Sequence, residues 1–449
     1  MNAKKSPYIK WFFFIVLAGV FFFTLSYSDI VSTLHRGMDF FDSLLSGNGF
    51  NNYTYETSHY IPIHILFGVW CLPMLLLCKL GVLCADSVFV YLWAKALLIV
   101  ALLTLIYSFR KLLDIVECDD KDFWTFALCT SSLLFLPTFS MGMYDILEIS
   151  IGLYAVTKAA KEDALSWMTL VILSVAVSFK FLFIFAAIVI VLIKEKRILY
   201  LIRNMLVVMS FSAFFFLIFT VGKVGTLDGG GLVNNYYCYI ADKVFPAMYD
   251  MPLFFIIFFI TCFSAYFSKP GKGKEFVKSV CWHCALAYVG FSLFLSSAHP
   301  QWFLLLVPFL LIFLAENKLS ATENILLLLL FELTITIVLA YKFDWVYLTN
   351  NNFSYLLLKD IQPLHLGGHE FADFRTLVSR LGLDWSINVL TAFSFSTAIF
   401  IFARNNPWKP AAPLGDGRSL PALKRWANVG KLVAYAGYFA LDVAIAIVF

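Results

Sequence analysis

Three ionisable side chains stand where apolar segments begin or end, and their types suit acid–base chemistry and phosphate binding. Asp29 follows the first apolar segment, Asp145 opens a later one in SMGMYDILEIS, and Lys180 separates two short apolar runs in SFKFLFIF. A carboxylate at such a boundary can act as a general base, and a lysine there can neutralise a phosphate. The structural alternatives are an aspartate at a helix end and a lysine that reaches to the membrane surface.

A polar turn joins two apolar segments in AHPQWFLLL. His299 and Gln301 offer hydrogen-bonding groups, and Pro300 fixes the turn between the two segments. We interpret His299 and Gln301 as lining a ligand pocket. Trp302 is also typical of the aromatic belt at a membrane surface, so a turn that only anchors the helices is the alternative.

The composition decides the class of protein that must position these residues. Of the 449 residues, 61% are hydrophobic and only 14% are charged, and the mean hydropathy is +0.83. An ordinary globular domain is about half apolar and a quarter charged. Runs of roughly 18 or more apolar residues indicate membrane spans. The sequence therefore predicts an all-α polytopic membrane protein with about 11–13 transmembrane helices.

The distribution of Lys and Arg predicts the orientation in the membrane. Basic residues are enriched in cytoplasmic loops, and the basic clusters fall on one side only if the apolar segment 61–83 does not cross the bilayer. That segment must dip in and return, or lie along the surface as a juxtamembrane helix. The prediction is a multi-pass protein of the inner (plasma) membrane with a cytoplasmic N-terminus. Its net charge of +4 then reflects anchoring at the inner face and not binding of nucleic acid.

Polar residues collect on the outer side of this predicted topology. Arg36 and Asp42 lie in the first outer segment together with Asp29, and Asp145, Lys180, His299 and Gln301 lie at outer turns. Six of the seven histidines also fall there: His35, His59, His64, His299, His365 and His369. Titratable residues gathered at one membrane face predict a site there. Outer loops are polar in any case, which is the alternative explanation.

The chain divides into three parts by composition. Residues 1–341 form the expected membrane core, and residues 342–404 form an outer loop with a closing transmembrane helix. From 405 to 449 a basic linker precedes a terminal apolar helix, in which we identify no chemistry. Glu332 is an acid in the middle of a predicted span, and its partner is not evident from the sequence.

Four motifs together resemble the GT-C superfamily of integral-membrane glycosyltransferases, which use sugars linked to polyprenyl phosphate. They are an aspartate just beyond the first span (SYSDIV), a Y-x-x-P start of an apolar run (SHYIPIHILF), the pair MGMYDILEIS and SFKFLFIF, and the turn HPQWFLLLVPF. The resemblance covers roughly residues 11–341. Each motif alone has low specificity. The resemblance rests on the order of the four motifs along the chain and on their predicted position on the same, outer side of the membrane.

The resemblance implies a role for each candidate residue. Asp29 would deprotonate the acceptor hydroxyl, with Asp39 and Asp42 as residues that could share this role. Lys180 and Arg36 would neutralise the lipid phosphate, and Asp145, His299 and Gln301 would hold sugar or acceptor. The pattern departs after Lys180, where Phe181 replaces the proline common in the superfamily. The implied reaction inverts the anomeric carbon.

The resemblance also implies the partners. They would be a polyprenyl-phosphate-linked sugar, membrane lipid, and a glycan, lipid or protein acceptor of the cell envelope. Some members use a divalent metal (Mg or Mn) and others do not, and the sequence offers no firm set of metal ligands.

Two other functions stay open. A flippase or another transporter of lipid-linked saccharide would handle the same lipid, and transporters often show internal repeats with sites at the membrane midplane. No such repeat is evident, and the polar residues favour one face. A polysaccharide polymerase would share the donor and the outer site but would transfer a whole chain.

Overall fold

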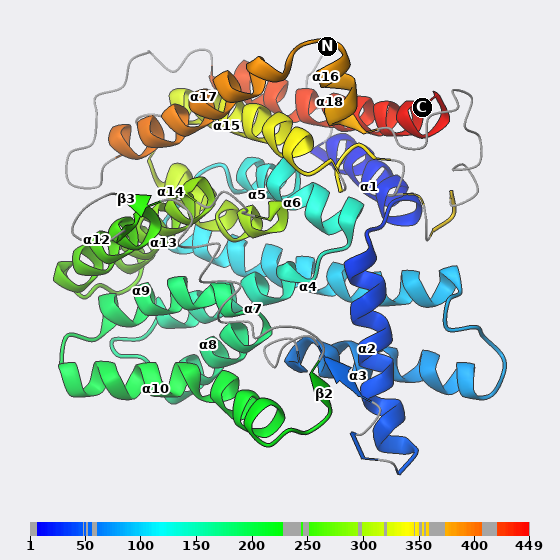
Figure 1. Cartoon of the computed structure of the whole chain (residues 1–449). Coiled ribbons are helices and arrows are strands. Elements are labelled where there is room, and N and C mark those ends of the chain that lie inside the picture. Colours follow the sequence, from blue (N-terminus) through cyan, green and yellow to red (C-terminus); the bar gives the residue numbers. More distant parts are fainter. Residues whose placement is uncertain are drawn as a thin grey trace. The chain divides into compact units, whose positions relative to one another are not determined.

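The structure is a computed structural model of the chain, and the residues it describes are almost entirely helical (Figure 1). It describes residues 7–47, 49–50, 53–55, 61–227, 244–245, 251–294, 299–317, 321–344, 346–349, 353, 356–358, 373–405 and 420–448. His59, His365 and His369 lie outside these ranges. The all-α class is confirmed.

Five helices within the described ranges are long and apolar enough to cross a membrane, or up to seven if each of two bent helix pairs counts as one span. Four more apolar helices have only 10–17 residues, below the roughly 20 that a span needs. The expected number of 11–13 included such short segments as separate spans. The chain is therefore a multi-pass membrane protein.

The helices group into two compact units, each made of segments far apart in the sequence. Unit 1 comprises Met1–Tyr27, Asp120–Gly142 and Leu314–Phe449, and unit 2 comprises Ser28–Asp119 and Met143–Phe313. The elements of unit 1 are α1 (Pro7–Thr24), α5 (Lys121–Cys129), α6 (Ser132–Phe135), η2 (Leu136–Met141), α15 (Ala321–Lys342), α16 (Phe374–Arg380), α17 (Asp384–Arg404) and α18 (Leu420–Val448). The three-part division expected from composition stays a prediction.

Unit 2 holds the candidate site residues. Its elements are α2 (Ser28–Leu45), β1 (Thr54–Tyr55), α3 (Ile61–Lys79), α4 (Val88–Ile115), α7 (Asp145–Ala159), α8 (Trp167–Phe179), η3 (Phe181–Phe183), α9 (Ile184–Lys194), α10 (Ile198–Phe215), η4 (Phe216–Val221), β2 (Thr226–Leu227), β3 (Val244–Phe245), β4 (Met251–Pro252), α12 (Leu253–Phe267), α13 (Lys274–Phe294) and η5 (Pro300–Leu305). Helix α14 (Val307–Glu316) begins in unit 2 and ends in unit 1.

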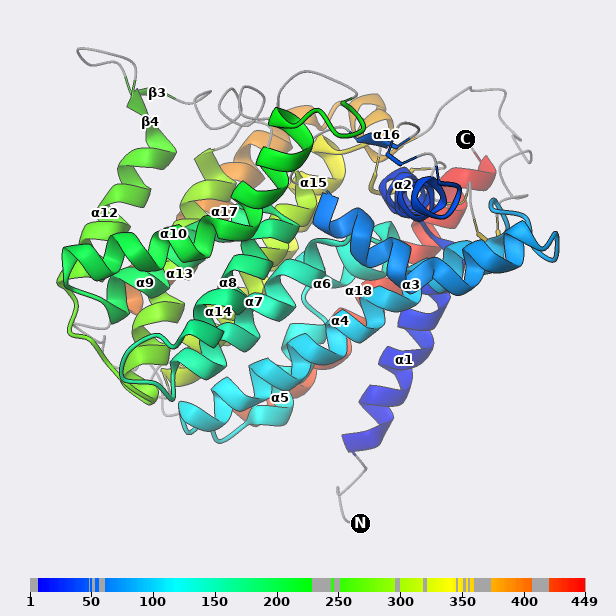
Figure 2. The ribbon, with the colours of Figure 1, turned by 90° about the horizontal axis from the view of Figure 1, so that it is seen from below.

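Helix α2 is amphipathic and runs across the direction of α7, α8 and α10. Its buried side consists of Ile30, Thr33, Leu34, Gly37, Met38, Phe40 and Ser43. Figure 1 shows α2 at a wide angle to those helices, and Figure 2, turned by 90°, shows it end-on. A helix with one apolar and one charged face is typical of the membrane interface.

Two glycines let α2 and α3 approach closely. A Cβ atom at Gly68 would lie 2.5 Å from the carbonyl oxygen of Gly37, and one at Gly37 would lie 2.8 Å from the backbone nitrogen of Gly68. Small residues allow such backbone contact between membrane helices. Helix α3 is continuous despite Pro73. It is also one of the helices long and apolar enough to cross a membrane, and its position as a juxtamembrane or re-entrant helix stays a prediction.

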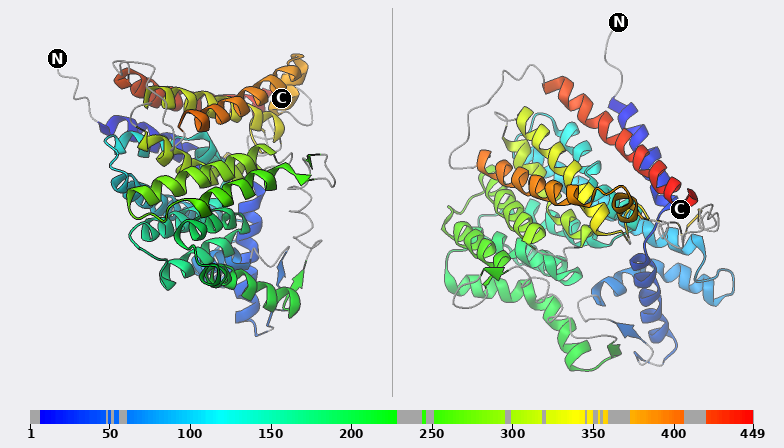
Figure 3. Two further views of the ribbon diagram at one scale, coloured as in Figure 1. Left: turned by 90° about the vertical axis from the view of Figure 1, so that its left-hand side faces the viewer. Right: turned by 45° about the horizontal axis from the view of Figure 1, so that its top comes forward.

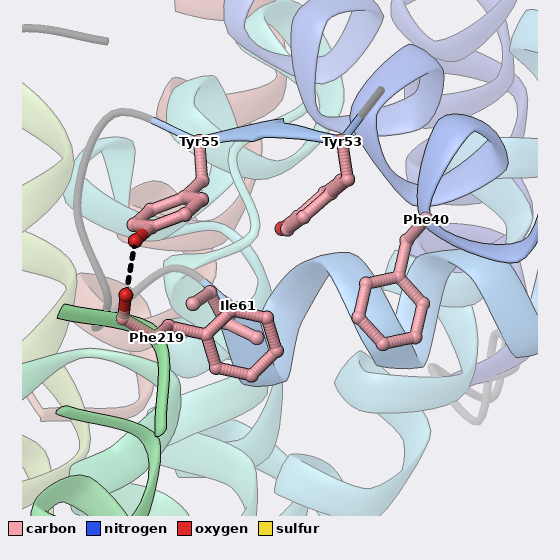
Figure 4. Packing of buried hydrophobic residues seen from close by; sticks show 5 residues of the cluster. All are labelled: Phe40, Tyr53, Tyr55, Ile61 and Phe219. Atoms are coloured by element: carbon pink, nitrogen blue, oxygen red, sulfur yellow. Dashed lines mark hydrogen bonds between the residues drawn. The ribbon is translucent and has the colours of Figure 1, made fainter. Parts of the chain in front are cut away.

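The segment after α2 is fastened by an aromatic cluster. Phe40, Tyr53, Tyr55, Ile61 and Phe219 pack together (Figure 4), and the Tyr55 hydroxyl donates to the Phe219 carbonyl at 2.6 Å. Phe219 lies in the π-helix η4. Strands β1 and β2 pair in parallel over two residues, so the loop that follows α2 is joined to the end of α10–η4.

A second clasp joins α3 to α4. The Trp70 indole donates to the Trp93 carbonyl at 2.7 Å, and the Trp93 indole donates to the Trp70 carbonyl at 2.9 Å. The two rings also stack with centroids 5.4 Å apart. Buried indole N–H groups need hydrogen-bond acceptors, and here each indole N–H is satisfied by the backbone carbonyl of the other tryptophan.

The basic turn between α9 and α10 caps helix ends with its own side chains. The Lys196 ammonium donates to the carbonyls of Ala265 and Tyr266 at the end of α12. Bonds from the Arg197 side chain lower the pKa of Glu195 to about 2. Cations at a helix C-terminus satisfy its last carbonyls, so this basic cluster has a structural role besides its bearing on orientation.

In unit 1, α18 runs beside α1, as the right view of Figure 3 shows for the red and dark blue helices. Phe21 of α1 packs against Tyr438 and Phe439 of α18. Helix α15 also contacts α17 and α18. The terminal apolar segment is thus a long helix packed into unit 1.

We predict that Gly68→Ala lowers the thermal stability of the detergent-solubilised protein. The added methyl would overlap the Gly37 carbonyl, and overpacking of this kind costs about 1–3 kcal/mol. Gly19→Ala in α1 is the matched control, because a Cβ there meets nothing within 4 Å. Equal melting temperatures for the two variants would contradict the close α2–α3 contact.

Candidate functional site

The centre of unit 2 contains a buried ion pair between two of the residues selected from the sequence. The Lys180 ammonium donates to Asp145 Oδ1 at 2.6 Å, and the side chains are 4% and 0% exposed. Removal of either partner of a buried ion pair leaves the other charge buried and uncompensated, which is strongly destabilising. Lys180 and Asp145 are therefore held as a unit.

Breaks in the helices place both members of the pair. Gly142 adopts a left-handed conformation at φ 76° after η2, and Asp145 then stands in the first turn of α7. Helix α8 ends at Phe179, and Lys180 is extended at φ −152° and ψ 126°. An anion at a helix N-terminus and a cation at a C-terminus are both favoured by the helix dipole.

Glu148, one turn beyond Asp145 on α7, adds a second acid at the same place. Its side chain is fully buried, and among the described residues only the backbone of Phe183 approaches its carboxylate, without a hydrogen bond of normal geometry. Asp145 Oδ2 and Gln301 Oε1 have no hydrogen-bond partner among the described residues. Buried acceptors without donors are costly, so a ligand with several hydroxyl groups would relieve them.

The turn HPQW forms η5, which packs on α7 and α13. Gln301 is buried, and His299 is half-buried with its ring 4.9 Å from that of Trp302. The 3-10 helix continues into α14 after Leu305. Gln301 thus lies on an element that contacts the helix of Asp145 and Glu148.

The other three candidates lie on α2. Asp29 is in its first turn and is partly exposed, as is Arg36 two turns on. Asp39 lies about one turn after Arg36 on the same helix. Asp42 forms an ion pair with Lys79, the last residue of α3.

The starts of α2 and α7 are linked by one backbone hydrogen bond. The amide of Tyr27 donates to the carbonyl of Met141 at 3.0 Å. Asp29 comes two residues after the donor, and Asp145 comes four residues after the acceptor. Because each residue extends the chain by at most about 3.6 Å, the two carboxylates begin their helices in the same part of the protein.

Among the described residues, no group of three or more His, Cys, Asp or Glu is arranged to hold a metal ion. Asp145 and Glu148 would be two carboxylate ligands, with Lys180 already bound to one of them. Use of Mg or Mn stays a prediction.

Two features of the structure were not predicted from the sequence. Glu148 is the second acid of the motif DILE. Its spacing of three residues from Asp145 puts both acids on one helix face, and this spacing could have identified Glu148 from the sequence. The partner of Glu332 is Lys431 of α18, with 2.5 Å between the two side chains. No spacing rule connects these two positions, so only the fold reveals that ion pair.

We predict that Glu148→Gln raises the melting temperature of the purified protein. The neutral amide keeps the shape of Glu148 and cannot ionise in a buried site that already holds the Asp145 carboxylate, so a gain of about 1–3 kcal/mol is expected. Glu275→Gln on the exposed start of α13 should leave the melting temperature unchanged. A fall in stability for Glu148→Gln would show that Glu148 is already well satisfied.

Unit 2 therefore combines a buried cation, buried hydrogen-bond acceptors and the ends of broken helices. No family model, no curated protein and no solved structure matches this chain.

Proposed function

We propose that this protein is a membrane glycosyltransferase that moves a sugar from a polyprenyl-phosphate carrier to a glycan, lipid or protein acceptor of the cell envelope. The observation that carries the proposal is the buried Lys180–Asp145 pair, with the buried acid Glu148 on the same helix and the buried Gln301 on η5, which packs against that helix. Such a place can hold a phosphate and the hydroxyl groups of a sugar together, which is what a lipid-linked sugar presents.

Lys180 is the residue proposed to bind the donor phosphate. On binding, the phosphate would share the ammonium with Asp145, which now holds it at 2.6 Å. As the bond between sugar and phosphate breaks, negative charge grows on the leaving phosphate. A fixed cation in a poorly hydrated site stabilises that charge strongly, and the burial of Lys180 provides such surroundings.

The buried acceptors are proposed to hold the sugar. Hydroxyl groups of the sugar would donate hydrogen bonds to Asp145 Oδ2, Glu148 and Gln301 Oε1. His299 precedes Gln301 at the start of η5 and would lie at the edge of this site. This arrangement satisfies atoms that are otherwise buried without donors. A sugar that lacks one of these hydroxyls would leave a buried carboxylate unpaired, so the contacts would also give specificity.

Asp29 is the proposed general base. It would take the proton from the acceptor hydroxyl, whose oxygen attacks the anomeric carbon as the carrier phosphate departs on the opposite side, so that the configuration inverts. Its partly exposed place at the start of α2 suits an acceptor that arrives from water. Arg36 on the same helix would help to neutralise the donor phosphate. Asp42 could bind substrate only after it releases Lys79, with which it now forms an ion pair.

The setting belongs to the proposal as well. The reaction would take place at the outer face of the inner (plasma) membrane, with the N-terminus in the cytoplasm. The amphipathic α2 supports an interfacial site, because Asp29 and Arg36, seven residues apart, share one partly exposed side at the border of its buried face.

Transport of a lipid-linked saccharide is a second candidate. The observation that favours it is the clustering of helix breaks at Gly142, Lys180 and His299, since transporters bind substrates where helices are interrupted. A polymerase would use the same donor site. The assay below separates transfer of a sugar from movement of a lipid.

Asp29→Asn should abolish sugar transfer while the protein still folds and binds the donor. General-base catalysis contributes roughly 10²–10⁴-fold to rate, so a loss in this range is expected. The assay uses right-side-out vesicles that contain the full chain, a panel of radiolabelled polyprenyl-phosphate sugars, and acceptor added outside.

Asp39→Asn and Asp42→Asn on the same helix are the matched variants, because they report whether either residue shares the role of base. Normal transfer by Asp29→Asn would remove Asp29 from the mechanism. A different result would favour the transporter hypothesis over the enzyme hypothesis: lipid crosses the bilayer of reconstituted vesicles while no sugar donor is consumed.

A further inference from the structure

A cavity of about 340 Å³ in unit 1 is bordered by α15, α18 and the α6–η2 segment. Most of its wall is apolar and includes Leu329, Leu333, Leu423 and Trp426. Sites for small molecules are largely apolar, with a few polar groups and volumes of roughly 300–1,000 Å³. The size and lining of this cavity therefore fit a small ligand or one lipid chain.

The ion pair Glu332–Lys431 stands at the wall of this cavity. Glu332 lies in α15, one of the helices long and apolar enough to cross the membrane. The Glu332 and Lys431 side chains are only 6% and 12% exposed. Ionisable residues at such a depth are costly and commonly mark a functional site.

The ammonium of Lys431 retains unused donors. Its 2.5 Å approach to Glu332 is an ion pair by distance, but Lys431 Nζ makes no hydrogen bond of acceptable geometry among the described residues. The hydroxyl groups nearby are already occupied: Thr336 donates to Ser132 at 2.6 Å, and Tyr435 donates to the Thr130 carbonyl at 2.9 Å. An occupant of the cavity would therefore be recognised through an acceptor atom that faces Lys431.

We propose that this cavity binds a neutral amphiphile with a hydroxyl head and one apolar chain, such as a long-chain lipid alcohol. A hydroxyl can accept from Lys431 and donate to Glu332 at the same time, while the chain covers the leucine and tryptophan walls. The ion pair has no net charge, so an anionic head would add an uncompensated charge in a poorly hydrated site. This site is separate from the proposed glycosyltransferase site and does not depend on it.

The test is photocrosslinking of the purified full chain in detergent, followed by identification of the labelled peptides. The probe is hexadecanol that carries a photoreactive diazirine, compared with diazirine palmitate and diazirine hexadecane. We expect hexadecanol to label peptides from α15 and α18 at least about tenfold more than the headless alkane, as the loss of hydrogen bonds to a charged group implies.

Two glycines of α18 supply a matched pair of variants. A Cβ at Gly430 or at Gly437 meets nothing within 4 Å, but only Gly430 lines the cavity. Gly430→Leu should abolish labelling by hexadecanol, and Gly437→Leu should leave it unchanged. The double variant Glu332→Leu/Lys431→Met removes both charges and both hydrogen-bonding groups together and should reduce labelling to the level of the alkane.

Three results would overturn the proposal. Equal labelling by hexadecane would mean an apolar void without recognition of a head group. Stronger labelling by palmitate would assign the cavity to an anionic lipid. Equal labelling of the Gly430→Leu and Gly437→Leu variants would place the bound probe outside the cavity.

Discussion

The contact between Lys180 and Asp145 imposes the main constraint on unit 2. A buried lysine and a buried aspartate must meet within hydrogen-bond distance, because either charge alone would be expensive inside a helical membrane protein. Their meeting requires α7 to begin near the end of α8, and α7, which also carries Glu148, packs against η5. The interruptions of three helices are therefore connected features of one arrangement.

The position of α2 depends on the fit of small and aromatic residues. Gly37 and Gly68 allow the backbones of α2 and α3 to touch, and the cluster around Tyr53 and Phe219 holds the chain that follows α2. The reciprocal Trp70–Trp93 bonds continue this support to α4. Asp29 thus starts a helix that is fixed along its buried face, and its own side chain is partly exposed.

The sequence predicted the class of fold and the residues at helix breaks more fully than it predicted their contacts. Hydropathy alone indicated an all-α membrane protein, and charges at the ends of apolar runs singled out Asp145 and Lys180. The pairing of these two charges depends on how α7 packs against α8, which periodicity does not encode. For the same reason the partner of Glu332 could not be named, since Lys431 lies on the terminal helix in a segment in which no chemistry had been identified. Glu148 was within reach, because its spacing from Asp145 is visible in the motif DILE.

The most direct test of the account is a double-mutant cycle on the buried pair, with thermal unfolding of the purified protein as the measurement. Asp145→Asn and Lys180→Met should each destabilise by about 3–5 kcal/mol, because each leaves one buried charge uncompensated, and the double variant should regain most of that loss. Two single effects that simply add in the double variant would show that the charges do not stabilise each other, and would contradict the central claim.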